Sequence, residues 1–233
     1  MKRFVIPILV LLILLFTSPA FAAGRLNVEQ ENYYTLKEGS YCYGYVFAKL
    51  ENSGNKPIKV NNGLLEIFDE EGDAITSSDS YTAYARYLDP GDYTYIRIST
   101  SIKNIESVSE VDDYMLTVTG KSGLDKQTIR LECQGKYVEN EKSGYYTYNY
   151  MYATVTNNTE EPLYQPYVVF ALLDEEENIL YLVGDNLDRN EALMPGSSII
   201  FRVAVDSDFV DYFEKNSIVP SSLDVIAYAY TDN

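Results

Sequence analysis

An internal repeat constrains the fold of this chain more than any other feature. A shift of 105 residues aligns 25–98 with 130–203 without a gap, and 17 of the 74 paired positions are identical. Identical pairs include Tyr41 and Tyr146, Asn52 and Asn157, Pro57 and Pro162, Leu88 and Leu193, Arg97 and Arg202. The chain is therefore one unit used twice, and such units fit two domains of ordinary size better than a solenoid.

The first 22 residues have the pattern of a secretory signal peptide. Lys2 and Arg3 precede the apolar run 4–16, and Ala20-Phe21-Ala22 is a small-x-small cleavage site. The run is shorter than the roughly 20 residues that span a bilayer. No cysteine follows it and no sorting signal ends the chain. We expect a secreted bacterial protein without a covalent anchor, divided into a signal peptide (1–22) and repeats at 23–129 and 130–233.

Each repeat has the apolar alternation of short β-strands separated by turn residues. The expected strands of the first repeat and the last strand of the second are 41–51, 57–68, 74–78, 81–88, 92–100, 114–119 and 224–230. One helix is expected at 207–215, capped by Asp206 or Ser207, with Phe209 and Phe213 on one face. About seven strands a repeat predict an all-β chain of two tandem immunoglobulin-like β-sandwich domains, with one short helix in the second.

Residues 170–174, Phe-Ala-Leu-Leu-Asp, resemble the motif of the FxLYD-type family, and residues 65–69 match it more weakly. Similar features are the turn at Asn157, Pro162, and Pro195-Gly196 followed by Phe201. The resemblance implies small immunoglobulin-like extracellular domains of Gram-positive bacteria, with no assigned chemistry and no catalytic residues.

Composition excludes several classes of function. The chain has no histidine, which rules out Ser-His-Asp and Cys-His catalysis and imidazole metal ligands. Its net charge of −17 argues against nucleic acid and anionic lipid as partners, because both bind through Lys and Arg. We expect no enzyme activity, cofactor or metal. A hydrolase using paired carboxylates stays an alternative, since the chain has 35 acidic residues.

Tyrosines alternate along one strand of each repeat. The first tyrosine row is Tyr41, Tyr43, Tyr45 and Phe47, and the second tyrosine row is Tyr146, Tyr148, Tyr150 and Tyr152. Tyr93, Tyr95 and Arg97 repeat the pattern on a neighbouring strand, as Ile200 and Arg202 do in the second unit. The rows continue into charged or hydroxyl residues and the opposite faces are aliphatic, so the tyrosines are expected to point outward. They form either docking surfaces or cross-strand pairs that only stabilise the sheet.

Two further features allow two interpretations each. The acidic turns 69–73 and 174–178 offer oxygen ligands for Ca²⁺ but lack EF-hand spacing, which favours solvated hairpin turns. Cys42 and Cys133 are not equivalent in the repeat. A secreted protein with two cysteines favours a Cys42–Cys133 disulfide at the domain junction, the alternative being two free thiols.

We therefore expect a secreted binding protein whose outward tyrosine rows dock an extracellular protein or a cell-wall glycan. A structural spacer or accessory domain of an envelope complex is the first alternative, and the carboxylate-based hydrolase is the second.

Overall fold

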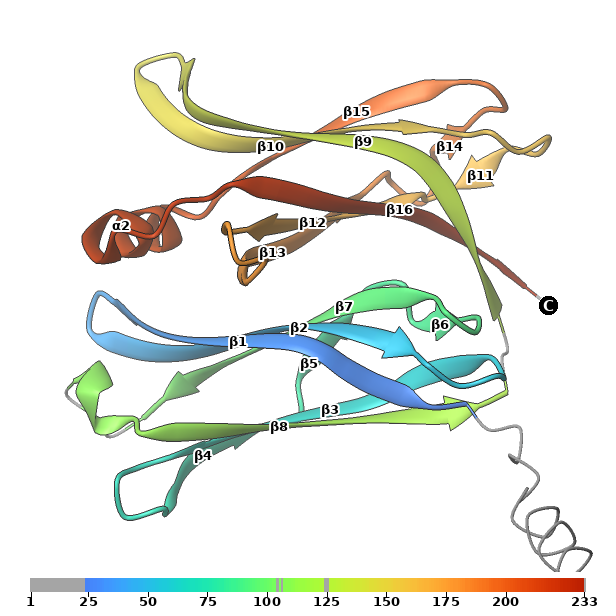
Figure 1. Ribbon diagram of the computed structural model, residues 1–233. Helices are drawn as coiled ribbons and strands as arrows, with labels where there is room; N and C mark the ends of the chain where they lie inside the picture. Colours follow the sequence, from blue (N-terminus) through green and yellow to red (C-terminus); the bar gives the residue numbers. More distant parts are fainter. Residues whose placement is uncertain (1–23, 104, 106, 124–125, 233) are drawn as a thin grey trace, which may run out of the picture.

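The computed structural model describes residues 24–103, 105, 107–123 and 126–232. The predicted signal peptide (1–22) lies outside the described residues. The described residues are all-β apart from a short 3₁₀ turn, η1 (Val108–Glu110), and one helix, α2 (Ser207–Asn216). Its sheets lie in four stacked layers, two from each repeat, and the second repeat folds back over the first (Figure 1). The all-β class with a helix in the second repeat is as predicted.

The first repeat has two antiparallel sheets. One contains, in spatial order, β1 (Leu26–Glu38), β2 (Tyr41–Asn52), β7 (Tyr93–Ile102) and β5 (Tyr81–Ala83). In the other, β3 (Ile58–Phe68) pairs along one edge with β8 (Asp113–Ser122), and β4 (Ala74–Ser78) and β6 (Tyr87–Leu88) pair with its other edge.

In the second repeat a single strand joins the two layers. The six-stranded sheet runs β13 (Ile179–Asn186), β12 (Tyr167–Leu173), β16 (Ser222–Asp232), β9 (Lys126–Ser143), β10 (Tyr146–Thr156), β15 (Ser198–Ala204). Strand β9 pairs with β16 through residues 126–131 and with β10 through 132–143. It therefore belongs to one layer at its start and to the other at its end (Figure 1). A small sheet of β11 (Leu163–Tyr164) and β14 (Ala192–Leu193) accompanies it.

The local predictions match the structure closely. Each predicted strand is present, although 81–88 is interrupted between β5 and β6. The carboxylate of Asp206 caps α2 by accepting the Asp208 N–H at 3.0 Å, and Phe209 and Phe213 are the buried residues of the helix. The aliphatic sides of β2 and β7, with Val46, Leu50 and Ile96, form the closed core of the first repeat.

Equivalent positions of the two repeats also form equivalent hydrogen bonds. The fully buried Asn52 side chain donates to the carbonyls of Lys56 (2.9 Å) and Leu88 (3.0 Å). Asn157, also fully buried, donates to the equivalent carbonyls of Glu161 (2.9 Å) and Leu193 (2.7 Å). Each amide thus joins three segments of its own unit, and this explains why both copies have asparagine at this position.

Replacing either asparagine with alanine should destabilise its unit by about 1–3 kcal/mol, because buried carbonyls would lose their donor. The effect should be similar for Asn52→Ala and Asn157→Ala, measured by urea unfolding. Asn190→Ala, at an exposed position, is the control. A loss no larger than that of the control would show that water replaces the amide.

The described residues include no helix long and apolar enough to cross a membrane.

Candidate functional site

The first tyrosine row is not an open surface. It lies on the predicted face, opposite the aliphatic core, but Tyr45 is 8% exposed and Phe47 is fully buried. Tyr95 on the neighbouring strand is 2% exposed, and Tyr43, Tyr93 and Arg97 are half-buried. Among the predicted binding residues of this unit, only Tyr41 is largely exposed, at 65%. The prediction that this face of the first repeat is an open docking surface is therefore wrong. In the structure the face is an interface between the two repeats.

The second repeat covers this face through α2, β13 and β16. Phe209 of the helix is the centre of the contact, with ring centroids 5.1 Å from Tyr45, 5.6 Å from Phe47 and 5.0 Å from Tyr181. These rings belong to the same apolar cluster as the interior of the second repeat. The two repeats therefore share a continuous aromatic interior, while the first keeps a separate core beneath β2 and β7.

A carboxylate closes one end of the same interface. Asp224 on β16 accepts hydrogen bonds from the hydroxyls of Tyr95 (2.6 Å) and Tyr93 (3.0 Å). Burial, and then the charge of Asp224, raise the pKa of Tyr93 to about 12, and the same causes raise the pKa of Tyr95. The two tyrosines therefore remain neutral donors over a wide range of pH.

The second tyrosine row remains open. Tyr146 is 69% exposed and Tyr148 is 39% exposed, while Tyr152 is half-buried. Tyr150 is 8% exposed but lies outside both core clusters. The core face of β10 carries Met151, which is fully buried. The side chains of the second tyrosine row therefore point away from the core, as predicted.

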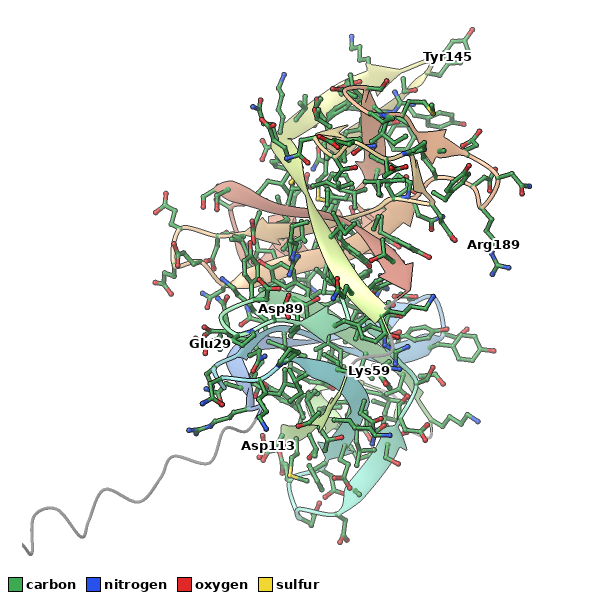
Figure 2. All side chains as sticks on the ribbon, turned by 90° about the vertical axis from the view of Figure 1, so that its right-hand side faces the viewer. Glu29, Lys59, Asp89, Asp113, Tyr145 and Arg189 are labelled. Carbon is green, nitrogen blue, oxygen red and sulfur yellow. The ribbon has the colours of Figure 1, made fainter. Side chains whose placement is uncertain are left out.

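The four rings of the second row form a ladder along β10. Successive centroids are 6.3, 5.6 and 6.1 Å apart from Tyr146 to Tyr152. The guanidinium of Arg202 lies 4.7 Å from the centroid of the Tyr150 ring, and the Tyr152 hydroxyl donates to the carboxylate of Glu141 at 2.6 Å. Ile200, on the neighbouring strand, is 66% exposed. The result is an ordered aromatic surface with a cation in its middle. Tyr145, at the turn that precedes the row, extends into solvent at the far end of the molecule (Figure 2).

The predicted disulfide is absent, and the geometry explains why. Cys42 and Cys133 are free thiols. Cys133 lines a small cleft with Tyr93, which pairs with Glu51 near the end of β2. Cys42 lies at the start of β2, so the strand rise separates the two thiols by roughly 30 Å, whereas a disulfide needs Cα atoms within about 7 Å. The prediction placed the start of β2 at the domain junction, but the chain leaves this unit beyond Ser122, which pairs with Ile58 at the opposite end.

The acidic turns are tight hairpins. The carboxylate of Asp69 accepts the Asp73 N–H, and that of Asp174 accepts the equivalent Asn178 N–H, both at 2.8 Å. The left-handed position is Gly72 (φ 80°) in the first turn and Glu177 (φ 66°) in the second. Within the described ranges, no group of three or more Cys, Asp or Glu side chains has the arrangement of a metal site.

Sequence reasoning missed the residues that cover the first row. Phe209 and Phe213 were recognised as one face of a helix, but their partner was not, and Asp224 and Tyr181 were not singled out. The available signal was the buried-type pattern of β13, where Ile179 to Leu182 are apolar on both faces of the strand. A strand apolar on both faces has a second layer above it.

No protein-family model matches the chain, and a search of curated proteins finds no match.

Proposed function

We propose that this chain is a secreted binding protein that docks an extracellular protein through the second tyrosine row. One observation carries the proposal. The same face exists twice, and in the first repeat it is a docking face, occupied by an aromatic helix and a strand of the second repeat. In the second repeat the face keeps its tyrosines and its stacked arginine but has no covering segment within the described chain.

The matching details support a retained docking geometry. Arg97 lies 5.5 Å from the Tyr45 ring, and its counterpart Arg202 lies 4.7 Å from the Tyr150 ring. If the tyrosines only stabilised the sheet by cross-strand contact, neither the exposed Ile200 nor an arginine over a tyrosine ring would be needed. Contiguous exposed aromatic area of this kind usually has a partner. By analogy with Phe209, the expected partner presents an aromatic or aliphatic side chain that packs between the tyrosine rings.

The test is the double variant Tyr146→Ser/Tyr148→Ser. Because both rings are exposed, their loss should cost only about 0.5–2 kcal/mol of stability. Secreted and envelope proteins captured by the mature chain are identified, and the affinity of each purified candidate is then measured. Binding should fall tenfold or more, about 1.4 kcal/mol.

Tyr164→Ser is the matched control, since Tyr164 is 66% exposed and lies on β11, outside the row. Equal binding by the double variant and the control would contradict the docking proposal and leave the spacer as the better interpretation.

A second experiment measures binding to purified cell-wall glycan. Binding there that depends on Tyr146 and Tyr148 would change the partner from protein to glycan.

A further inference from the structure

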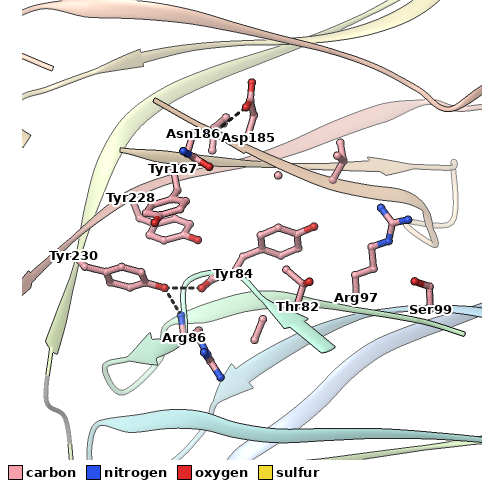
Figure 3. A pocket seen from close by; sticks show the side chains of 14 residues that line it. Thr82, Tyr84, Arg86, Arg97, Ser99, Tyr167, Asp185, Asn186, Tyr228 and Tyr230 are labelled. Atoms are coloured by element: carbon pink, nitrogen blue, oxygen red, sulfur yellow. Dashed lines mark hydrogen bonds between the residues drawn. The ribbon is translucent and has the colours of Figure 1, made fainter. Parts of the chain in front are cut away.

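A second candidate site lies between the repeats, on a different part of the molecule from the second tyrosine row. It is a cleft of about 620 Å³, within the range of small-ligand sites. The first repeat supplies its floor from 82–86 and from β7, and the second supplies the opposite wall from β12, β13 and β16 (Figure 3). The site therefore exists only when the two repeats are packed together.

Hydrogen bonds fix the aromatic wall in place. The rings of Tyr167 and Tyr228 stack with centroids 5.2 Å apart and planes 10° apart. The Tyr230 hydroxyl donates to the carbonyl of Tyr84 at 2.6 Å and accepts the Arg86 N–H at 3.1 Å (Figure 3). Both bonds cross between the repeats, so the wall is held before any ligand arrives.

Close packing at Gly184 sets the position of a further ring. A Cβ atom on this residue would lie 2.4 Å from a ring carbon of Tyr84. Any side chain at position 184 would push that ring out of its place. The glycine therefore allows Tyr84 to lie against the backbone of β13 with its ring along the cleft.

The cleft also contains a cation in an otherwise acidic protein. The guanidinium of Arg97 reaches from the first repeat toward the second and donates to the Leu182 carbonyl at 3.4 Å (Figure 3). Within the described residues it forms no ion pair with a carboxylate. Arg86, which also lines the cleft, donates to the Tyr81 hydroxyl at 2.7 Å, and its Nε atom is buried without a hydrogen-bond partner. The cleft is thus lined by two arginines and one carboxylate, that of Asp185 on β13, in a chain whose net charge is −17.

We propose that this cleft binds a small acidic sugar, with its carboxylate on Arg97 and its ring against the tyrosine wall. Guanidinium groups bind carboxylates through paired, charge-assisted hydrogen bonds. Tyrosine offers a flat apolar face with a hydroxyl at its edge, which suits a sugar ring. Hydroxyl and amide groups of Thr82, Ser99 and Asn186 line the same cleft and match the hydroxyls of the ligand. A purely apolar ligand would make no hydrogen bonds with these groups.

The first test compares two probes that differ only in the acid group. Saturation-transfer NMR is recorded on the mature chain with glucuronate and with glucose. Glucuronate should receive saturation and compete at a concentration at least tenfold lower than glucose. Equal binding of the two sugars, or no transfer to glucuronate, would overturn the proposal.

An exposed arginine outside the cleft provides a matched control variant. Arg97→Gln should weaken glucuronate binding tenfold or more, whereas Arg25→Gln removes the same charge from an exposed position outside the cleft and should leave the binding unchanged. A loss of the same size in both variants would mean a general charge effect and would contradict the proposed site. Thr82→Trp fills the cleft from an exposed position without changing its charge, and it should abolish binding even if Arg97→Gln does not fold. Unchanged binding in Thr82→Trp would also overturn the site.

Discussion

Replacing Phe209 with alanine should lower the free energy of unfolding of the whole chain by about 3–5 kcal/mol. The side chain is 2% exposed, and its ring contacts Tyr34, Tyr45, Phe47 and Tyr181. Two of the four layers contribute to this contact. The cavity left by alanine would lie between two sheets whose strands are fixed by their own ladders, so it cannot close.

Urea unfolding followed by circular dichroism measures the effect. Phe209→Leu keeps most of the buried volume and should cost much less than the alanine variant. Val219→Ala, at a position 65% exposed, is the surface control. A change below about 1 kcal/mol in Phe209→Ala would show that the repeats are held together mainly by their polar contacts.

The protein should lose stability steeply above pH 10. Burial raises the pKa of Tyr34, of Tyr84 and of Tyr93, each to about 12. Each of these tyrosines therefore keeps its proton in the folded state at pH values where the unfolded chain releases it. A raised pKa in the folded state contributes stability that is complete below the unfolded pKa of about 10, and this contribution is lost as the pH rises through the folded pKa.

The magnitude follows from proton counting. One proton held only by the folded state changes the free energy of unfolding by about 1.4 kcal/mol per pH unit, so three such tyrosines give a slope of about 4 kcal/mol per pH unit. Tyr93 is only half-buried, and solvent screens its interactions, so its own share of this slope is smaller than that of the other two tyrosines. The stability of the chain should therefore disappear between pH 10 and pH 12.

Tyrosinate absorbance and circular dichroism, followed together during a pH titration, test this expectation. The exposed tyrosines should ionise first, and the buried ones should ionise together with unfolding. Tyr34→Phe removes one of the three groups and should make the loss of stability with pH shallower. Complete tyrosine ionisation while the circular dichroism remains native would contradict the raised pKa values.

The sequence predicted the elements of this fold because their causes are local. Strand alternation, the turns at 52–55 and 90–91, and the capped helix at 207–215 depend on neighbouring residues, and each lies where it was expected. The assignment of the tyrosines to the face opposite the aliphatic core also held, since a strand alternates strictly between two faces.

Exposure could not be predicted in the same way. Whether Tyr45 contacts water depends on where a segment more than 130 residues later in the chain packs, and the two tyrosine rows are nearly identical locally. The two rows differ in exposure because α2, β13 and β16 pack on the first row, whereas no described segment packs on the second. The same limit applies to the cysteines, whose separation depends on which end of the unit the chain leaves from.

The two repeats contact each other through different faces, β1, β2 and β7 of the first against β12, β13, β16 and α2 of the second. A contact between unlike faces does not close on itself as a two-fold pair does. Each added unit would present a fresh copy of the receiving face, as the second unit does here with β10 and β15. The duplication has thus produced one step of a head-to-tail stack, in which β10 and β15 carry the next copy of the receiving face.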